Sequence, residues 1–417
     1  MRLAYIVPFF PYLYTPWLFR EMAWMRDRGH SVVVISLGDP PGPRAALEDF
    51  GLDGVPVLQV RVMRQSYLSL AKDAFRLLPS RWLARGGDSL IARQRESGFC
   101  QGLHEWMRLK QIVAFLREHR IDVMDAHWAA HSASMALQAK RATGVPFAVR
   151  IHGGDVYRSP SPQLPAIVHE ADAVCCVSRF VRDLLHGERL LESLPVVPRV
   201  SLDCDKVHIC PNGIPSHVVA TEPAHQCAAD QTIVTIGRID PEKRHGDLIE
   251  AVAALSSRFP GLRLKIIGGG TLESQLRQRA VQLAVADRVE ITGALPWSEV
   301  IRARDHGHIY VHASIVEGCS LSILEGMAAG VPMLISRVGA AEECVREGVN
   351  GFTFDAADTG TLTALLGRLL ETSPSRRREM GAVSLQVVRE KFELGTTMPQ
   401  VESILMGIRN RPVAVGR

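Results

Sequence analysis

The chain has 417 residues, of which 47% are hydrophobic, and this is enough to fill the cores of two domains of ordinary size. Its formal charge of +4 is small for that length, which excludes nucleic-acid binding over the whole surface. The sequence contains no run of the ~20 apolar residues that a membrane-spanning helix needs, and residues 1–7 are too short for a signal peptide. We therefore expect a globular, cytoplasmic protein that is not integral to a membrane.

The first elements alternate between strand and helix. Residues 3–7 predict a strand, and residues 31–35 predict another. Between them, Thr15 and Pro16 begin a helix that ends near Gly29. Two strands joined by a helix are expected to lie parallel in one sheet.

The loop at residues 8–14 leaves the carboxyl end of the first strand, where open α/β sheets bind their ligands. It has no glycine, and Phe9, Phe10, Tyr12 and Tyr14 provide rings on which a ligand can stack. The alternative is that these aromatic side chains pack beneath the loop.

Residues 58–99 are the least regular part of the first half, because aromatic and aliphatic residues are interleaved with lysine and arginine. Between residues 61 and 150 there are 15 Lys and Arg against 7 Asp and Glu. Basic amphipathic stretches can lie on an anionic membrane surface, but most pack on a protein core. The sequence leaves both interpretations open.

Helical spacing resumes at residues 103–118 and 129–141, with predicted strands at 123–125 and 146–151. The second of these strands leads into a short polar segment, which is the next candidate for a binding site.

That segment is His152-Gly153-Gly154-Asp155. The two glycines let the backbone approach a ligand, while His152 and Asp155 offer a donor and an acceptor near neutral pH. A lone histidine is usually structural, but a position at the end of a strand favours a site.

Residues 173–177 predict a buried strand that carries Cys175 and Cys176. The eight cysteines include no C-x-x-C pair, so we expect free buried thiols and no disulfide framework. Residues 207–210 predict the last strand of the first half, and residues 216–230, rich in small and polar side chains, predict a linker. Two domains joined in this way are expected to close on a ligand.

The second half begins with a predicted strand at residues 232–236, followed at once by Gly237, Arg238 and Lys243. Arg238 can hold phosphate oxygens in a bidentate manner and Lys243 supplies a compact positive charge. Together they can offset the charge of a diphosphate leaving group. A simple surface ion pair is the alternative.

A glycine turn follows the strand predicted at residues 264–267. Gly268 and Gly270 would let the backbone come close to a phosphate. Because the full G-x-G-x-x-G fingerprint is absent, this turn alone does not indicate a dinucleotide site.

Two glutamates flank the start of a helix that follows the strand predicted at residues 308–311. Glu317 lies in the loop, the helix begins near Ser320, and Glu325 lies inside it. The free N–H groups of a first helical turn favour a phosphate. Two carboxylates would repel it unless they face hydroxyl groups, and a nucleotide sugar carries both a diphosphate and hydroxyls.

We therefore expect the loop and first turn to contact this donor through Gly318, Cys319, Ser320 and Leu321 as well. The alternative is an exposed glutamate on a surface helix.

Two further patterns do not predict a metal site. Asp203 and Asp205 have D-x-D spacing, which is common by chance, and His306, His308 and His312 are spread too far along a strand for one ion. No metal and no cofactor is expected.

Several of these motifs resemble those of one family. Glu317 and Glu325, followed by Gly330-Val331-Pro332, resemble the E-x7-E signature of retaining GT-B glycosyltransferases of glycosyltransferase family 4. Residues 237–243 resemble its G-R-x-x-x-x-K motif, and residues 152–155 its H-G-x-D segment, in the style of bacterial transferases that build exopolysaccharide or lipid-linked saccharides.

The resemblance extends from Leu3 to about Phe354, with two departures. Residues 211–214 resemble the family's P-N-G-[VI]-D turn, but Pro215 stands in place of the aspartate. Ala340 stands where a second glycine is usual.

The resemblance implies an α/β protein of the GT-B class, with two Rossmann-like domains facing a cleft. Residues 1–215 would be the acceptor-side domain, 216–230 the linker and 231–389 the domain that binds the nucleotide sugar. A last helix at about residues 390–417 would pack back on the first domain.

The family's roles transfer to matching positions as expectations. Glu325 would hold the ribose, Glu317 and His152 would position the sugar, and Arg238 and Lys243 would stabilise the leaving group. On the acceptor side we expect Phe9, Tyr12, Tyr14 and Asp155.

The activity so implied is retaining, metal-independent transfer from a nucleotide-diphosphate sugar to a saccharide or lipid-linked acceptor, in exopolysaccharide or cell-surface glycan synthesis. The protein would then work in the cytoplasm, at or near the inner face of the membrane. One alternative is a non-catalytic GT-B partner subunit that binds a saccharide, suggested by Ala340 and the glycine-free loop. Another is a nucleotide-sugar epimerase or a phosphorylase, although the E-x7-E segment favours transfer.

Overall fold

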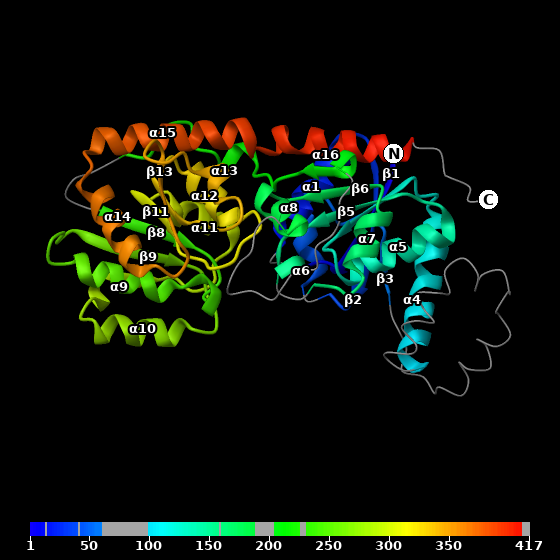
Figure 1. Cartoon of the computed structure of the whole chain (residues 1–417), viewed down its shortest axis with the longest axis horizontal. Helices are drawn as coiled ribbons and strands as arrows, with labels where there is room; N and C mark the ends of the chain where they lie inside the picture. Colours follow the sequence, from blue (N-terminus) through cyan, green and yellow to red (C-terminus); the bar gives the residue numbers. More distant parts are fainter. Residues whose placement is uncertain are drawn as a thin grey trace. The chain divides into compact units, whose positions relative to one another are not determined.

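The computed structural model describes residues 1–12, 15–40, 42–60, 99–157, 160–187, 204–225 and 231–410. The chain divides into two compact units. Unit 1 comprises Met1–Cys176, Arg182–Cys210 and Pro399–Arg417, and unit 2 comprises Val177–Val181 and Pro211–Met398. Each unit contains one parallel sheet with helices packed on it (Figure 1).

The sheet of unit 1 has the strand order β3-β2-β1-β4-β5-β6-β7, and each neighbouring pair is parallel. Its strands are β1 (Arg2–Phe9), β2 (Ser31–Gly38), β3 (Val57–Gln59), β4 (Val123–His127), β5 (Phe147–Ile151), β6 (Ala173–Cys176) and β7 (Val207–Ile209). Every residue of β4 and β5 is buried, as expected for central strands of a parallel sheet covered on both faces.

The connections of unit 1 are mostly helical. They are α1 (Pro16–Asp27), η1 (Arg44–Phe50), α4 (Phe99–Glu118), α5 (His131–Thr143), α6 (Gly154–Tyr157), α7 (Leu164–Glu170), α8 (Arg179–His186) and η2 (Cys204–Lys206). Helix α5 packs on β1, β4 and β5, and α1 packs on β2. Helix α1 begins at Pro16, whose missing N–H is not needed there, and Gly29 adopts φ +81° just beyond its end.

The last helix, α16 (Leu394–Arg409), contributes its residues from Pro399 onward to unit 1. Val401, Leu405 and Ile408 are buried on it. Glu402 accepts from Arg28 Nη2 at 3.3 Å and lies 2.7 Å from His30 Nε2, which ties the helix to the segment between α1 and β2.

The sheet of unit 2 has the order β10-β9-β8-β11-β12-β13, again with parallel neighbours. Its strands are β8 (Gln231–Ile236), β9 (Leu262–Ile267), β10 (Val289–Ile291), β11 (Ile309–His312), β12 (Met333–Ser336) and β13 (Gly351–Phe354). In both sheets the order reverses beside the first strand, between β1 and β4 and between β8 and β11. The carboxyl ends at such a reversal are where open α/β sheets bind ligands.

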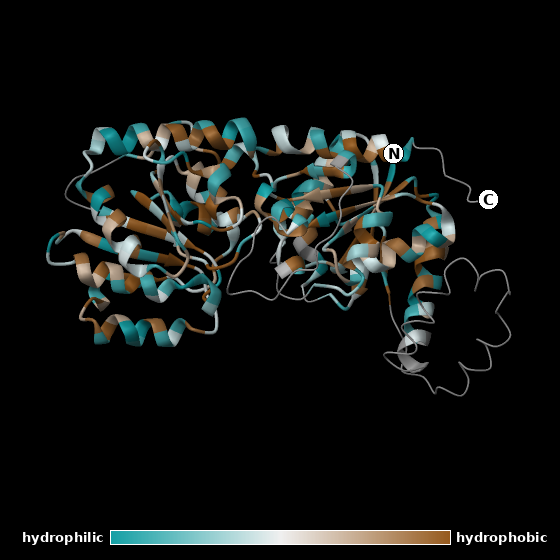
Figure 2. Ribbon diagram, in the orientation of Figure 1, coloured by the Kyte–Doolittle hydropathy of each residue, from teal (hydrophilic) through white to brown (hydrophobic). Residues whose placement is uncertain are grey.

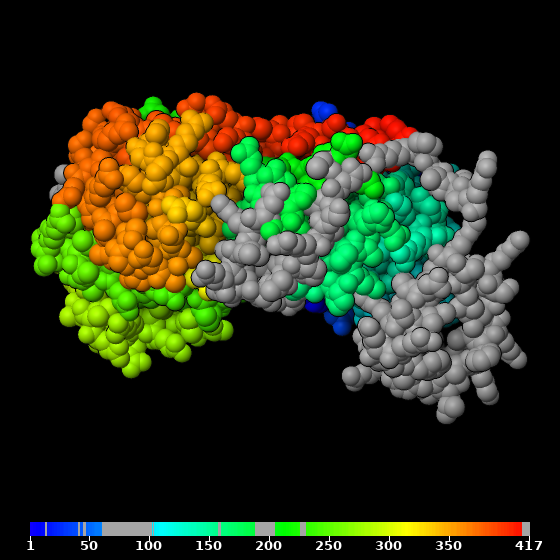
Figure 3. Space-filling view, viewed as in Figure 1, coloured from blue at the N-terminus to red at the C-terminus, as the bar shows by residue number. Residues whose placement is uncertain are grey.

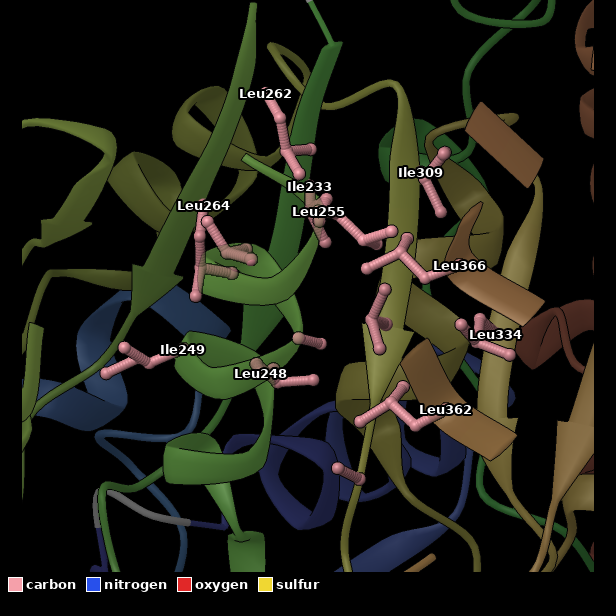
Figure 4. Close-up of a cluster of buried hydrophobic side chains, with 14 of the residues drawn as sticks. Ile233, Leu248, Ile249, Leu255, Leu262, Leu264, Ile309, Leu334, Leu362 and Leu366 are labelled. Atoms are coloured by element: carbon pink, nitrogen blue, oxygen red, sulfur yellow. The ribbon is translucent and has the colours of Figure 1, made fainter. Parts of the chain in front are cut away.

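Helices cover both faces of this second sheet. The elements are η3 (Ser216–Val218), η4 (Pro241–Lys243), α9 (His245–Leu255), α10 (Glu273–Gln282), η5 (Ala286–Arg288), α11 (Trp297–Arg304), α12 (Leu321–Ala328), α13 (Ala341–Cys344), α14 (Thr359–Glu371) and α15 (Pro374–Lys391). One face, with α9, α10 and α14, holds a buried apolar cluster that includes Leu248, Leu264 and Leu366 (Figure 4). On the opposite face of the sheet, α12 lies against β11 and β8, and α15 covers α12.

The distribution of hydropathy agrees with this layering. Hydrophobic residues gather on the strands, whereas α10 and α15 also carry many hydrophilic residues (Figure 2). Residues of α10 and α14 form part of the surface of unit 2 (Figure 3).

None of the described helices is long and apolar enough to cross a membrane. The amphipathic interpretation of residues 58–99 falls almost wholly outside the described residues, which resume at Phe99.

The predicted α/β class with two Rossmann-like sheets is confirmed. Two predictions need correction. The strand expected at 308–311 runs from Ile309 to His312, so His312 is its last residue. Residues 216–225 of the expected linker belong to unit 2, where Ala220 N–H donates to Ala328 O at 2.8 Å and Ala224 N–H donates to Gly330 O at 3.0 Å.

Candidate functional site

The loop after β8 is held by backbone contact with the turn after β9. A Cβ on Gly268 would lie 2.0 Å from Gly237 O, and a Cβ on Gly270 would lie 2.5 Å from Ile239 O. Ile239 N–H donates to Gly269 O at 2.9 Å, so the two turns are bonded as well as packed. Gly268 N–H donates to Thr292 Oγ1 at 3.2 Å. In this structure, therefore, Gly268 and Gly270 fix the loop that carries Arg238 and Lys243.

Lys243, Glu317 and His312 form a compact cluster at the carboxyl ends of β8 and β11, in which His312 is buried and Lys243 and Glu317 are partly buried. Lys243 Nζ donates to Glu317 Oε1 at 2.5 Å, and His312 Nε2 lies 2.8 Å from the same oxygen. Burial opposes ionisation of Glu317, but the Lys243 ammonium and the His312 ring outweigh it and hold the pKa of the carboxyl well below its usual range. Glu317 is therefore an anion with its position fixed from two sides.

Two imidazoles near this pair are neutral. Burial lowers the pKa of His245, the first residue of α9, to about 3, and His312 and Lys243 add to the effect. Burial also lowers the pKa of His312, although Glu317 acts in the opposite direction. The charged groups of the cluster are thus Lys243 and Glu317.

Arg238 lies at the edge of the site, with about half of its side chain exposed. It pairs with Asp240 and donates to Glu242 Oε1 at 3.3 Å. Glu242 O in turn accepts from Ile315 N–H at 3.0 Å, which joins the loop after β8 to the loop after β11. Arg238 and Lys243 are thus carried on one loop, as the sequence predicts, but each already has acidic partners.

Helix α12 begins at Leu321, directly after Ser320, whose Oγ lies 2.9 Å from Ser322 Oγ. Glu325 is 7% exposed, and its Oε1 accepts from Trp297 Nε1 at 2.9 Å. Arg304 Nη1 donates to the carbonyl of the same residue at 2.9 Å. Glu325 is therefore not an exposed glutamate on a surface helix, which was the alternative interpretation.

The loop before α12 is packed on two sides. Gly339 has φ +55°, and a Cβ there would lie 2.5 Å from Gly318 O. Asn212 Nδ2 donates to Cys319 O at 2.8 Å, so the P-N-G turn fixes this loop. Burial raises the pKa of the Cys319 thiol to about 12, which leaves it unreactive.

In unit 1, Asp155 joins the loops after β4 and β5. Its carboxylate accepts from Ala129 N–H at 2.6 Å and from His152 N–H at 3.1 Å. The carboxyl is buried, which raises its pKa to about 6. Its contacts are thus with the backbone of its own unit, and the expected acceptor-side role stays a prediction.

The His152 ring is enclosed by aromatic rings. Trp17 and Trp128 lie 4.7 and 4.9 Å from it by ring centroid, and His127 stacks on it at 5.3 Å. Trp128 has φ +70°, a strained conformation for a bulky residue. Burial lowers the pKa of His152 well below its usual value, with His127 and Arg150 adding to the effect, so the ring is neutral.

The aromatic loop of unit 1 is only partly described. Phe9 is 47% exposed and its ring lies 6.3 Å from that of Tyr12, edge to face. Phe10 is fully buried and packs on Phe19, so for this residue the packing alternative holds. Tyr14 lies outside the described residues.

Among the described residues, no group of three or more His, Cys, Asp or Glu side chains is arranged to hold a metal ion. His308 Nδ1 accepts from Thr232 N–H at 3.1 Å, and His312 contacts Glu317. Asp203 of the D-x-D triplet falls outside the described part of the chain. The described cysteines Cys175, Cys176, Cys210, Cys319 and Cys344 are free and buried, as predicted.

Sequence reasoning missed several residues of these sites. In the sequence His312 belongs only to the widely spaced histidine pattern, and its place beside Glu317 depends on where β11 ends. Trp297 lies 28 positions before Glu325, and no spacing rule joins the two. His127 and Trp128 lie two and three residues beyond the end of the strand predicted at residues 123–125, and that position is the available signal.

The comparisons with known proteins agree with this architecture. Residues 225–382 match the family model described as glycosyl transferases group 1, and residues 18–198 match the glycosyl transferase 4-like domain. The chain is 27% identical over 317 residues to a GDP-mannose-dependent alpha-(1-6)-phosphatidylinositol monomannoside mannosyltransferase of Mycolicibacterium smegmatis. That alignment covers 72% of this chain and 80% of the relative.

Solved structures share the fold at low sequence identity. The Anabaena protein HepE in complex with UDP has a TM-score of 0.71 and 16% identity, over 98% of this chain and 100% of that one. A glycosyltransferase from Rickettsia africae has a TM-score of 0.70 and 15% identity, over 99% of each chain. These likenesses confirm the predicted GT-B fold.

Proposed function

We propose that this glycosyltransferase, which is built from a 4-like and a group 1 glycosyl transferase domain on the GT-B fold, moves a sugar from a nucleotide-diphosphate sugar to a saccharide or lipid-linked acceptor with retention of configuration. The observation that carries the proposal is the Lys243–Glu317–His312 cluster, which lies where the strand order of unit 2 reverses.

Lys243 is suited to a diphosphate because an ammonium has three N–H donors and Glu317 uses one of them. A bound diphosphate would then share the ammonium with Glu317, and the half-exposed Arg238 guanidinium would contact the same phosphates. The first turn of α12 supplies backbone N–H groups and the positive end of its dipole. These groups would stabilise negative charge as the leaving group departs.

Glu325 is proposed to hold the ribose hydroxyls. Trp297 and Arg304 fix its side chain and its backbone, which gives the carboxylate the rigid placement that hydroxyl recognition needs. Glu317 would contact the sugar in the same way, because an ionised carboxylate accepts hydrogen bonds from hydroxyl groups.

The proposed reaction is a displacement on one face of the sugar. The bond from the anomeric carbon to the phosphate oxygen breaks, the acceptor oxygen forms its bond on the same face, and the acceptor proton passes to the departing phosphate. Glu317 is a poor nucleophile, since Lys243 and His312 both contact its Oε1. Without a covalent bond to Glu317, the positive charge that develops at the anomeric carbon would be stabilised by nearby neutral or anionic groups.

The acceptor is proposed to be lipid-linked. A relative at 27% identity is named for transfer from GDP-mannose to a phosphatidylinositol monomannoside, which supports a glycolipid acceptor and GDP-mannose as the first donor to test. The enzyme would then work at the inner face of the cytoplasmic membrane, in cell-surface glycan or exopolysaccharide synthesis. A UDP-sugar is the second donor to test, since a structural neighbour is solved with UDP.

The test is release of nucleoside diphosphate from a panel of nucleotide sugars, with and without glycolipid acceptors. We expect release from one donor, and we expect Lys243→Ala to lower kcat/KM about 10²- to 10³-fold, as loss of a charge that stabilises the leaving group does. Glu325→Ala should mainly weaken donor binding. The anomeric configuration of the product, read by NMR, tests retention.

A matched control is Lys265→Ala. Lys265 also pairs with a glutamate, Glu290 at 3.1 Å, but it lies in the middle of β9. An equal loss of kcat/KM in Lys243→Ala and Lys265→Ala would contradict the assignment of Lys243 to the leaving group. Thermal stabilisation by a nucleotide sugar, without release in the presence of acceptors, would instead favour the binding-only partner subunit.

A further inference from the structure

Trp128 directly follows β4, at the carboxyl end of one of the two strands between which the order of the unit 1 sheet reverses. Its backbone has φ +70°, in the left-handed region. A bulky side chain rarely adopts this conformation. Such strain persists only where surrounding contacts enforce it, and it is concentrated at ligand sites. The residue is therefore a candidate for binding, although it lies outside the motifs identified in the sequence.

Two hydrogen bonds hold the peptide groups on either side of the Trp128 Cα. Trp128 N–H donates to Arg150 O in β5 at 2.9 Å, and Ala129 N–H donates to Asp155 Oδ2 in α6 at 2.6 Å. Asparagine or glycine would adopt this conformation with less strain. Since the backbone does not favour tryptophan at this position, the reason for tryptophan lies in its side chain.

The indole of Trp128 borders a cluster of rings and is not enclosed by it. Its ring centroid lies 4.9 Å from that of His152, 5.9 Å from that of Trp17 and 6.1 Å from that of His127. Trp17 is 7% exposed and His127 is fully buried, whereas Trp128 is only partly buried. Trp128 thus combines a strained backbone with an indole that solvent can reach, and packing of the core requires neither.

The chemistry around this indole suits a sugar ring. The face of an indole is flat, apolar and electron-rich. A pyranose presents C–H groups on one face and hydroxyl groups at its rim, so it can stack on an indole while its rim bonds to polar groups. The His152 ring beside the indole has nitrogens that can bond to such a hydroxyl. Ligand sites commonly combine an apolar wall with a few polar groups in this way.

We propose that Trp128 binds a pyranose ring by stacking, and that the hydrogen bonds from Trp128 and Ala129 hold the backbone so that the indole presents a face to the sugar. This inference rests on the proposed function for the identity of the ligand as a sugar. The pyranose belongs to the nucleotide sugar or to the acceptor, and both sources have the same ring chemistry. The test separates them.

The test is 19F NMR of the full chain labelled with 5-fluorotryptophan at its six tryptophans. The resonances of Trp128 and Trp297 are assigned by their loss in Trp128→Phe and Trp297→Phe. The probes are GDP, UDP, GDP-mannose, UDP-glucose and methyl α-mannoside. Trp297 donates to Glu325, the proposed ribose ligand, so its resonance should shift with GDP or UDP alone.

The Trp128 resonance should shift only with a probe that contains a pyranose. A shift with a nucleotide sugar would assign the bound ring to the donor, and a shift with methyl α-mannoside would assign it to the acceptor. A shift with GDP or UDP alone would overturn the inference, because the indole would then respond to the nucleotide. So would a Trp128 resonance that no probe shifts while the Trp297 resonance responds. If no probe shifts either resonance, the proposed function fails, and the inference fails with it.

Two variants show whether the indole serves the ligand or the fold. Trp128→Asn removes the ring, and asparagine tolerates positive φ. Its melting temperature should stay close to that of the unsubstituted protein, because relief of backbone strain offsets the lost ring contacts. The KM of the substrate whose pyranose is bound should rise about 10-fold, as loss of an aromatic contact does, with little change in kcat. Trp128→Phe, which keeps a smaller ring, should show a smaller rise.

The matched control is Trp24→Phe in α1. Trp24 is also partly buried, and its ring centroid lies 5.5 Å from the guanidinium carbon of Arg28. This variant should leave the KM of donor and acceptor unchanged. Unchanged KM values in Trp128→Asn would overturn the inference, and a lower melting temperature in that same variant would assign the indole to the core.

Discussion

His245 shows how burial of one residue sets a pH dependence. Its ring is enclosed at the start of α9, and burial, with His312 and Lys243, lowers its pKa to about 3. In the unfolded chain the pKa of the same ring is near its ordinary value of 6.5. Between these two values the unfolded state binds more protons than the folded state, so the free energy of unfolding must fall as the pH is lowered.

We therefore expect the unsubstituted protein to lose about 1.4 kcal/mol of unfolding free energy per pH unit below about 6.5 from this residue alone. His245→Gln removes the titration, so its urea-unfolding curve should shift less between pH 7 and pH 4.5. His217→Gln, which changes an exposed histidine of unit 2, should behave like the unsubstituted protein. Equal acid sensitivity in all three would mean that His245 is not held neutral.

The two predicted glutamates show what a motif fixes at the scale of a residue and what it leaves open. The spacing of Glu317 and Glu325 correctly placed one in the loop and one in the helix. It could not give the partners of either, because His312 and Trp297 reach them only through the folded arrangement of β11 and α11. Sequence can thus nominate a carboxylate, while its charge state depends on neighbours that the fold supplies.

At the scale of elements, the periodicity of the sequence predicted most strands and helices because each has a clear apolar pattern and a glycine or proline at its end. Ser373, a favourable capping residue directly before Pro374, caps α15, and its Oγ accepts from Arg376 N–H at 3.3 Å. The packing of the glycine turns was not foreseen. A glycine that approaches a phosphate and a glycine that approaches another loop look alike in sequence.

The turn after β9 gives a direct test of this packing. Gly268 has φ +145°, and a Cβ there would lie 2.0 Å from Gly237 O. Gly268→Ala should therefore force apart the two turns and displace the loop that carries Lys243. We expect a loss of roughly 1–3 kcal/mol in unfolding free energy from the strained backbone alone, together with a large fall in kcat.

The matched substitution is Gly367→Ala in α14. A Cβ there meets Leu255 Cδ2 at 3.5 Å, which is ordinary contact, and alanine favours a helix by roughly 0.5–1 kcal/mol. That variant should be as stable as the unsubstituted protein or more so, with full activity. A Gly268→Ala variant that matched it would show that the two turns separate without cost.

At the scale of the whole molecule, the structure assigns different chemistry to the two units. Unit 2 offers a cation, a fixed carboxylate and the first turn of α12, all suited to a diphosphate. Unit 1 offers a neutral histidine in an aromatic enclosure and a buried carboxylate bonded to backbone. A nucleoside diphosphate without its sugar should therefore bind through unit 2 alone.

Hydrogen exchange of the full chain, with and without nucleoside diphosphate, measures which of the two units binds the diphosphate. We expect slower exchange at residues 237–243 and 317–325, because those loops would contact the phosphates and the backbone N–H groups of the first helical turn would bond to them. Exchange at residues 152–155 should change only when the complete nucleotide sugar is added, since the family resemblance implies that His152 positions the sugar. Protection at residues 152–155 by the diphosphate alone, with residues 237–243 unaffected, would move the donor site to unit 1. The assignment of Lys243 to the leaving group would then be wrong, although the fold that carries both loops would be unchanged.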